Sequence, residues 1–501
     1  MTDNWIERVT SLIAPRWHLQ RMRAKVAANL IKRNYEGAAG GRRTQGWTRA
    51  STDAVRAVGP FTGRLRDAAR NLVRNNAYAA SAITTIVDHT VGWGITAKLT
   101  NGNQKARIQW KAWAETTACD ADGRHDFAGL QKLVMRTVVE SGECLVRRRF
   151  RRPEDGLPIP MQLQILEPDF LDSTKDTLGL PGGARIINGV EFDPLGRRVA
   201  YWLYPEHPGS AFATASSYRV PADGVLHVFD CTRPGQVRGP SWFAPVLVTF
   251  NDFDELSDAT LMKQKIAACL AVITSDVDGS AAPLGSTDTS QDPQIDSLEP
   301  GMILNVPAGR SIEVVQPPSV REYKDYAATT LKAIAAGLGI TYEDMANDYA
   351  DLPFSAARMS RLRHQARVDD WRWRLLIPQF CTPVWGWFLD TAAIFGAQAE
   401  GVEWTAPPLA MIDPDKEGTA YGRNIRLGIQ TLREALQERG YDPDAVLVER
   451  AADDQMLDDL GLILDSDPRQ TTQQGQLQGK AVPKPAPAVP SGIGKPVAGG
   501  G

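Results

Sequence analysis

The chain has few cysteines, few histidines and no long apolar run. Its 501 residues include five cysteines and six histidines. No two cysteines form a Cys-x-x-Cys pair, and the odd count argues against a disulfide framework, as expected in a reducing cytoplasm. The longest apolar run, Ile266 to Ile273, is far shorter than the roughly 18–20 residues that span a bilayer. Asp3 and Glu7 stand where an export signal is basic and then apolar, so no such signal is predicted.

Motifs of the common enzyme classes are also missing. The sequence has no Gly-x-x-x-x-Gly-Lys-Ser/Thr loop, which argues against a packaging ATPase. It has neither His-Glu-x-x-His nor Gly-x-Ser-x-Gly, and its histidines are scattered. Asp252-Phe253-Asp254 and Asp120-Ala121-Asp122 lack neighbouring ligands, and carboxylate pairs alone do not specify a metal site. The sequence therefore predicts no catalytic residue, no cofactor and no metal.

What the chain does contain is typical of a soluble protein with several domains. Hydrophobic residues make up 43% and charged residues 23% of a chain too long for one ordinary core. The net charge of −3 is unevenly distributed. Residues 1–74 carry 15 basic and 5 acidic side chains, whereas the rest carries 41 and 54. This asymmetry indicates an acidic or polyanionic partner at the basic end.

The N-terminal part is predicted to be helical and basic. Residues 4–34 are expected to form a helical stretch interrupted at Pro15, and residues 63–92 one helix with apolar side chains at helical spacing. The arginines of this second helix fall largely on the opposite face: Arg64, Arg66, Arg70 and Arg74. Composition alone favours a solvent-exposed surface for them, and contact with a polyanion is the alternative.

After residue 100 the pattern changes from helical to alternating. Residues 103–141 predict two helices, the second capped by Asp126 and ended by Gly142. Residues 143–230 then alternate in polarity and contain turn signals such as Asn188-Gly189. Because their connections are short, these residues predict a β-rich and mostly antiparallel domain.

The central part is expected to hold two long helices around an acidic excursion. Residues 246–273 predict one helix of about 28 residues, roughly 42 Å long, and residues 320–337 predict a second. Between them, residues 274–300 carry six carboxylates and no basic side chain, which is typical of an exposed segment. Residues 302–306 and 311–315 are expected to pair as short strands.

The stretch from Gly337 to Pro378 has two halves of opposite charge. Four carboxylates crowd a predicted loop: Glu343, Asp344, Asp348 and Asp351. A long arginine-bearing helix follows, for which Ser355 is the expected N-cap. Its apolar residues recur mainly at three- and four-residue steps and are expected to be buried: Met359, Leu362, Ala366 and Trp373.

The C-terminal part divides into a helical unit and a tail. Residues 414–462 predict short helices, one of them starting at the capping box Thr431-Leu432-Arg433-Glu434. From about Asp467 the chain is rich in Gln, Pro, Gly and Ala without aromatic residues, which predicts disorder.

Several motif blocks follow one another between residues 35 and 460. They are Arg70-Asn71-Leu72-Val73-Arg74-Asn75-Asn76, Gly92-Trp93-Gly94-Ile95, Arg233-Pro234-Gly235-Gln236 with Arg238-Gly239, Ile334 to Glu343, Asp348-Tyr349, and Ser355-Ala356-Ala357-Arg358. In order and spacing these blocks resemble the lambda-type family of phage portal proteins. Leu352-Pro353-Phe354 departs from the family pattern, so the turn into the following helix is expected to differ.

The resemblance implies an α+β, multi-domain portal fold with a wing of helices and mostly antiparallel strands. The implied parts are the basic helices and α/β wing (1–245), first stem helix (246–273), clip (274–319), second stem helix (320–337), tunnel loop (338–354), long spine helix (355–398), helical crown (399–466) and disordered tail (467–501).

The resemblance also implies where such a subunit meets its partners. The tunnel loop would face DNA through Tyr342, Glu343, Asp344, Asp348 and Asp351, supported by Arg358 and Arg361. The clip would dock the terminase through Asp288, Asp292, Asp296 and Glu299. The basic wing would meet acidic partners through Arg66, Arg70 and Arg74.

The implied assembly is a ring, usually of twelve copies, at one capsid vertex of the virion. It would be built in the bacterial cytoplasm without a membrane. Its implied partners are double-stranded DNA, the terminase large subunit, the major capsid and scaffold proteins, and the head–tail adaptors. Two other functions remain open at this point: a different head or connector component, and an enzyme that processes nucleic acid. The enzyme would need clustered metal carboxylates, which the sequence does not display.

Overall fold

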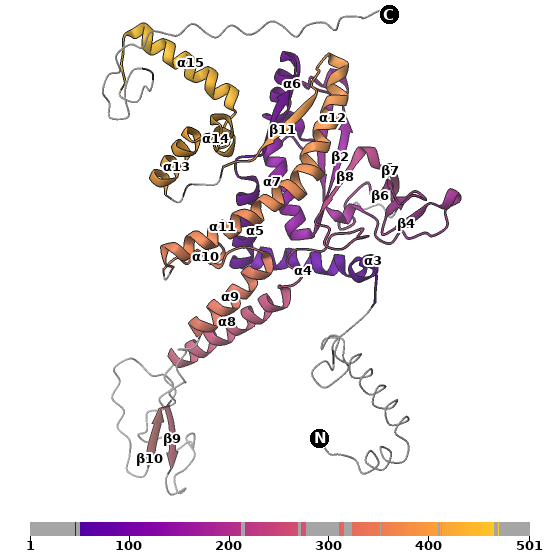
Figure 1. Ribbon diagram of the computed structural model, residues 1–501. Helices are drawn as coiled ribbons and strands as arrows, with labels where there is room; N and C mark the ends of the chain where they lie inside the picture. Colours follow the sequence, from indigo (N-terminus) through magenta and orange to yellow (C-terminus); the bar gives the residue numbers. More distant parts are fainter. Residues whose placement is uncertain are drawn as a thin grey trace, which may run out of the picture. The chain divides into compact units, whose positions relative to one another are not determined.

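The computed structural model describes residues 46, 51–211, 216–268, 272–276, 310–314, 323–350, 352–408, 411, 413–464 and 469 (Figure 1). The chain divides into two compact units, residues 1–57 and residues 58–501. The predicted helix at 4–34, most of the acidic excursion at 274–300 and nearly all of the predicted tail lie outside the described residues. None of the described helices is long and apolar enough to cross a membrane.

The second unit mixes helices with antiparallel sheets, which confirms the α+β prediction. The described helices are α3 (Ala54–Val58), α4 (Thr62–Asn75), α5 (Ala77–Val91), α6 (Gln104–Ala114), α7 (Phe127–Ser141), α8 (Leu247–Ala268), α9 (Tyr323–Leu338), α10 (Tyr342–Ala346), α11 (Phe354–Asp370), the π-helical η9 (Trp371–Cys381), α12 (Thr382–Ala392), α13 (Pro414–Arg426), α14 (Leu432–Glu438) and α15 (Pro443–Leu460). Short 3₁₀ turns link several of the elements.

The strands form small sheets. They are β1 (Thr96–Thr100), β2 (Glu143–Phe150), β3 (Met161–Leu166), β4 (Arg185–Ile187), β5 (Val190–Phe192), β6 (Arg198–Leu203), β7 (Tyr218–Pro221), β8 (Val225–Phe229), β9 (Val272–Asp276), β10 (Arg310–Val314) and β11 (Gly401–Thr405). One sheet has the order β3-β2-β8 and another β4-β5-β6-β7. Every strand pair within these two sheets is antiparallel, as predicted for residues 143–230.

The predicted helix at residues 63–92 is two helices instead of one. Asn76 has extended backbone angles between α4 and α5, and its side-chain oxygen caps α5 by accepting a hydrogen bond from the amide of Ala79 at 3.0 Å. The Asn76 amide group also donates to Asp254 in α8 at 2.7 Å. The break occurs because the asparagine can satisfy the free amides of a new helix start.

The core lies where α5, α6, α7, η9 and α12 meet. Five aromatic side chains pack against one another there with ring centroids about 5–6 Å apart: Trp110, Trp113, Phe127, Phe380 and Phe388. Asp126 caps α7 through the amide of Gly129, and Gly142 ends this helix in a left-handed conformation. Both of these predicted helix boundaries are confirmed.

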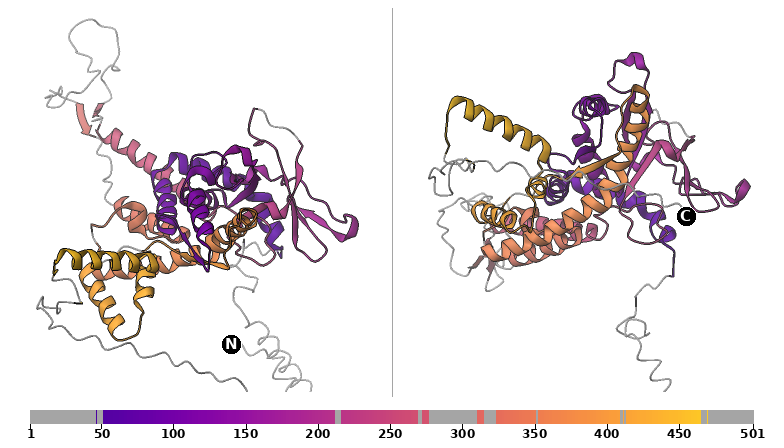
Figure 2. Two further views of the ribbon diagram at one scale, coloured as in Figure 1. Left: turned by 90° about the horizontal axis from the view of Figure 1, so that it is seen from above. Right: turned by 45° about the horizontal axis from the view of Figure 1, so that its top comes forward.

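The first of the two long helices is shorter than predicted. Helix α8 ends at Ala268 in the described chain, and Val272 and Ile273 lie in β9, so the prediction of one helix to residue 273 is wrong. The β-branched run favours a strand there. The predicted strand at 311–315 is present as β10, but it pairs with β9, and residues 302–306 lie outside the described residues. Helices α8 and α9 lie side by side (Figures 1 and 2), with the hydroxyls of Ser257 and Tyr323 2.9 Å apart.

The predicted spine helix differs from expectation in its start and its buried face. Its N-cap is Pro353 and not Ser355, and no side chain caps it. The expected buried stripe is wrong, since Met359 is 68%, Leu362 48% and Trp373 52% exposed. The face that packs on the rest of the subunit instead carries His364, Val368 and Trp371. From Trp371 the helix widens into the π-helical η9, where Pro378 cannot supply an amide to a regular α-helical ladder.

The region predicted as a helical crown begins with a strand. Strand β11 pairs with β1 in the register Thr96↔Thr405, joining parts of the chain about 300 residues apart. Helices α13, α14 and α15 follow, and the capping box of Thr431 and Glu434 starts α14 as predicted. Asp442 caps α15, which has Pro443 at its first position.

Candidate functional site

The acidic segment predicted as a loop contains a short helix. Helix α9 ends at Leu338, and Gly339 takes a positive φ of 76° with the side chain of Arg367 packed close to its α-carbon. Thr341 then caps α10 by accepting a hydrogen bond from the amide of Asp344 at 3.2 Å. Asn347 ends the helix in the left-handed region, where asparagine is well tolerated. The segment therefore holds its carboxylates on a defined turn.

Two tyrosines fix the carboxylates of this segment. The hydroxyl of Tyr342 donates to Asp348 Oδ2 at 2.9 Å, and the hydroxyl of Tyr349 donates to Asp344 Oδ1 at 3.1 Å. Burial and the neighbouring Asp348 raise the pKa of Tyr342 to about 12. The same hydrogen bond lowers the pKa of Asp348 below its usual value. Both groups therefore keep their usual charge at neutral pH, with Tyr342 protonated and Asp348 ionised.

The predicted tunnel-loop residues lie in different environments. Asp348 is exposed, while Tyr342, Glu343 and Asp344 are half-buried. Asp351 lies outside the described residues. Of the predicted supports, Arg361 lines the same cavity as Glu343 and Asp344, whereas Arg358 is exposed and lines a different cavity beside α13 and α14.

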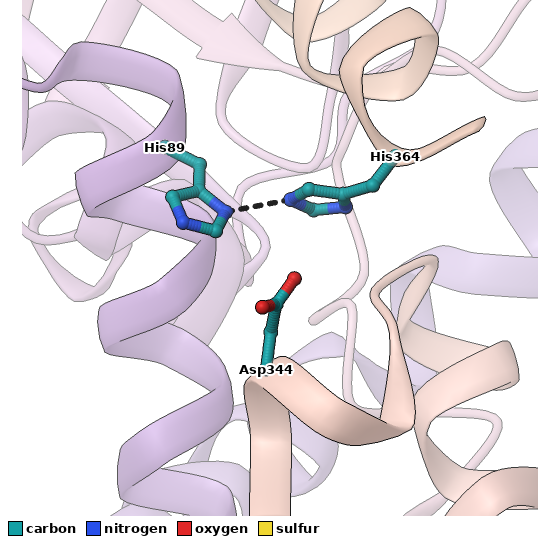
Figure 3. Close-up of side chains that lie close together, drawn as sticks. All are labelled: His89, Asp344 and His364. Carbon is teal, nitrogen blue, oxygen red and sulfur yellow. Dashed lines mark hydrogen bonds between the residues drawn. The ribbon is translucent and has the colours of Figure 1, made fainter. Parts of the chain in front are cut away.

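The half-buried side of the segment faces two histidines that the sequence did not single out. His89 Nδ1 in α5 and His364 Nε2 in α11 are 2.7 Å apart, and Asp344 points toward the pair from α10 (Figure 3). Burial lowers the pKa of His89, and burial followed by the proximity of His89 lowers the pKa of His364 to about 4. Both imidazoles are therefore neutral at pH 7. A cavity of about 380 Å³ lies beside them.

The arginines predicted for the basic wing do not share one surface. Arg74 is exposed, but Arg66 is only 3% exposed and Arg70 is half-buried, so the expected solvent-exposed arginine face is wrong for Arg66. Arg66 pairs with Glu143 at 3.3 Å and with Asp169 at 2.9 Å. Arg70 pairs with Asp169 at 2.8 Å. These arginines join α4 to the chain around β2 and β3.

Glu143 is the centre of this buried charge cluster. Its carboxylate accepts from Arg238 Nε at 2.7 Å and from the amide of Gly239 at 3.1 Å, and lies 2.8 Å from His227 Nε2. Gly142 and Gly239 touch through their backbones, and a Cβ on either one would collide with the other residue. Within the Arg238-Gly239 motif, Arg238 therefore neutralises the buried carboxylate of Glu143, and Gly239 allows the close backbone contact with Gly142.

The remaining predictions from the sequence concern the clip carboxylates and the cysteines. The clip residues Asp288, Asp292, Asp296 and Glu299 lie outside the described residues. Four of the five cysteines are described and all four are unpaired, which agrees with the absence of a disulfide framework among them: Cys119, Cys144, Cys231 and Cys381. The histidine pair had no spacing signal, because its members are 275 residues apart.

Comparison with known proteins assigns the family. Residues 40–372 match the model of the phage portal proteins of the lambda family. The chain belongs to this family. It is 25% identical to a probable portal protein of Halomonas phage phiHAP-1 over 86% of its length and 88% of that protein. It is also 23% identical to the portal protein of Escherichia phage N15, over 83% of this chain and 89% of that protein. The third relative, portal protein B of Escherichia phage lambda, is 24% identical over 65% of this chain and 68% of that protein.

Two solved structures align with part of this chain at low sequence identity. A chain in the neck of a native gene transfer agent particle, computed with C12 symmetry, aligns with a TM-score of 0.48 and 14% identity over 76% of this chain and 94% of that one. A neck of the empty particle, computed with C6 symmetry, gives a TM-score of 0.46 and 16% identity over the same shares. Family membership makes this chain a structural protein of a phage-type particle, where it assembles as a ring, and not an enzyme.

Proposed function

We propose that copies of this chain form a ring-shaped DNA conduit at one capsid vertex, which docks the terminase during packaging and later joins head to tail. The match to the lambda portal family over residues 40–372 carries this proposal. Its further partners are the major capsid and scaffold proteins during assembly and the adaptor proteins afterwards. Twelve copies and assembly in the host cytoplasm belong to the same proposal.

The parts of the subunit fit this function. Helices α8 and α9 serve as the stem, and the segment between them, with its carboxylates at Asp288, Asp292, Asp296 and Glu299, serves as the clip that docks the motor. The two antiparallel sheets and α4–α7 form the wing, and α13–α15 form the crown. The exposed Arg74 and the basic residues before it would meet acidic partners at the wing, whereas Arg66 is occupied inside the fold.

We assign the tunnel loop to residues 338–354, with Asp348 as its exposed carboxylate toward DNA. Lysine and arginine contacts to phosphate give DNA its affinity for proteins, so a ring of carboxylates does the opposite and keeps moving DNA from adhering. The hydrogen bond from Tyr342 supports this role because it favours the charged form of Asp348. Asp351 would extend the same acidic lining.

The spine helix supplies a second argument for a ring. Its apolar side chains Met359 and Leu362 are largely exposed in the single subunit. A ring needs two different complementary faces on each copy, and an apolar face exposed in one copy is covered by the next. We propose that these side chains pack against the neighbouring subunit.

Electron microscopy of the purified full-length protein tests the proposed assembly. The expected images show closed rings with a central channel. A monomeric protein, or particles without a channel, would refute the conduit function.

A change on the spine helix tests the proposed contact between copies. Leu362→Asp is expected to shift the protein from rings to monomers in analytical ultracentrifugation, because it buries a charge in an apolar interface. Leu195→Asp is the matched control, since Leu195 is 78% exposed in a turn remote in sequence from the spine. Leu362 is 48% exposed in the subunit, so the melting temperature of the monomer should change little. Rings that persist in the Leu362 variant would remove this face from the interface.

A further inference from the structure

We propose that His89, Asp344 and His364 form a binding site for a divalent transition-metal ion, with Zn²⁺ as the best match. The three residues come from α5, α10 and α11, and their candidate ligand atoms all lie within 4.8 Å of one another. In Figure 3 the two rings approach each other edge to face and the carboxylate points toward them from a third side. A single ion among them would tie α5 to α10 and α11, which follow about 250 residues later in the chain.

The chemistry of the three side chains selects the metal. Two imidazole nitrogens and one carboxylate oxygen are the ligand set of many three-residue zinc sites, in which water takes the fourth position. Hard cations such as Mg²⁺ and Ca²⁺ prefer oxygen ligands, so this set disfavours them. The cavity of about 380 Å³ beside the residues has room for that water and for entry of the ion.

The ring nitrogens must separate slightly to bind the ion. His89 Nδ1 and His364 Nε2 are 2.7 Å apart, whereas two nitrogens on a tetrahedral zinc are about 3.4 Å apart. The metal-free pair is joined by a hydrogen bond, so the imidazole that donates it must carry its proton on its other ring nitrogen when the ion binds. The required change in the distance between the two nitrogens is below about 1 Å, and the Asp344 oxygen, which lies within 4.8 Å of both, must approach the ion as well.

Neighbouring groups orient the carboxylate and balance the charge. Tyr349 donates to Asp344 Oδ1, and Thr85 donates to the backbone carbonyl of Asp344 at 3.3 Å, so partners outside the ligand set hold the residue in place. Arg361 and Arg372 line the cavity, and their positive charges disfavour a bound cation. Arg372 directs its guanidinium away to the carbonyls of His89 and Thr90, both at 2.7 Å. The carboxylate of Glu343 lines the same cavity and offsets part of the remaining positive charge, whereas Asp88 is paired with Lys132 at 2.9 Å.

A second cluster of similar composition is a weaker candidate and serves as the control. Glu167, Asp169 and His207 also lie within reach of one ion. Their carboxylates already pair with Arg70 at 3.0 and 2.8 Å. A metal would have to displace that guanidinium, so this cluster is expected to stay empty.

A metal at the first cluster would fix α10 against α5 and α11, and with it the acidic segment that starts at Thr341. This holds for any location of that segment in an assembly. The inference therefore goes beyond the DNA-conduit function and can fail or succeed independently of it.

Metal content of the full-length protein tests the site. After incubation with Zn²⁺ and dialysis, mass spectrometry is expected to find one zinc per chain. The Co²⁺-substituted protein is expected to show the intense visible absorption of a four-coordinate site. His364→Gln and His89→Gln should each weaken zinc affinity by more than about 10-fold. Losing a residue that only hydrogen-bonds to a metal ligand already costs about 10- to 100-fold, and these two residues are proposed to bind the metal directly. His207→Gln should bind zinc as the unchanged protein does.

Folding is checked separately, so that a loss of metal is not mistaken for unfolding. Circular dichroism of the two glutamine variants should match the unchanged protein, and zinc should raise the melting temperature of the unchanged protein but not of His364→Gln. No retained zinc, or equal zinc affinity in His364→Gln, would overturn the site and leave only a hydrogen-bonded histidine pair. Loss of zinc in His207→Gln alone would move the site to the second cluster and equally overturn the proposal.

Discussion

Replacing Glu143 with alanine is expected to lower the local free energy of unfolding around β2 and β8 by about 3–5 kcal/mol, the usual cost of removing one partner of a buried ion pair. Glu143 is fully buried and neutralises Arg66 and Arg238, which are 3% and 2% exposed. The alanine variant leaves both guanidinium groups buried without their central countercharge. The expected loss follows from that uncompensated charge more than from the lost hydrogen bonds.

The stabilisation that Glu143 provides is also expected to depend on pH, because its carboxyl group must be ionised to neutralise the arginines. Burial alone would raise the pKa of Glu143, but Arg238 and then His227 hold it well below its usual range. A carboxyl whose pKa is lowered by folding stabilises the fold above its unfolded pKa of about 4.3 and loses that effect as the pH falls toward the folded value. Acid should therefore destabilise the unchanged protein more than the alanine variant.

Native-state hydrogen exchange measures this effect, because it reports the opening free energy of individual amides in β2 and β8. Glu154→Ala is the matched control, since Glu154 is an exposed carboxylate in the turn after β2. The control should change these amides by less than about 0.5 kcal/mol, as surface substitutions usually do. An alanine variant of Glu143 as stable as the control would refute the stabilising role of the cluster.

Replacing Asp348 with lysine is expected to slow DNA packaging and to reduce the DNA retained in filled heads. Each lysine that reaches a phosphate adds about 0.9 to the slope of the DNA affinity against salt concentration, and a ring repeats the change in every copy. Asp348 is exposed, and its carboxylate accepts hydrogen bonds from the Tyr342 hydroxyl and the Ala350 amide, both within its own segment. The fold of the subunit should therefore tolerate the substitution at a cost of about 0–1 kcal/mol.

Packaging assays with purified heads and terminase, together with the salt dependence of DNA binding by isolated rings, measure this second effect. Glu206→Lys is the matched control, because it adds the same charge at an exposed position in the segment after β6. The control should package DNA at the normal rate. If Asp348→Lys also packages and retains DNA normally, and its salt slope is unchanged, the assignment of residues 338–354 to the channel is wrong.

Local signals were reliable where a few neighbouring residues decide the structure. Asp126 and Gly142 bound α7, Asn188-Gly189 turns the chain between β4 and β5, and Thr431 with Glu434 starts α14. Each of these features satisfies backbone groups within four or five residues, so the sequence contains all of its partners. The family, too, was recognisable from the order of short blocks, and it is confirmed.

Predictions failed where a partner lies far away in the chain. The apolar stripe of α11 was assigned to the interior, but Met359 and Leu362 are exposed and His364 faces the core. An apolar stripe shows that a face is covered by something, and it does not say by which chain. Strand β11 was missed because its partner β1 lies about 300 residues earlier.

The sequence by itself determined the family, the ends of α7, the start of α14, the turn at Asn188-Gly189, and the crowding of carboxylates between residues 343 and 351. Only the tertiary structure decided that Arg66 is neutralised inside the fold by Glu143, and that His89 and His364 meet beside Asp344. The physical reason is the range of the forces involved. Caps and turns are satisfied by neighbouring residues, whereas buried charges and ligand clusters depend on side chains that only the folded chain brings together.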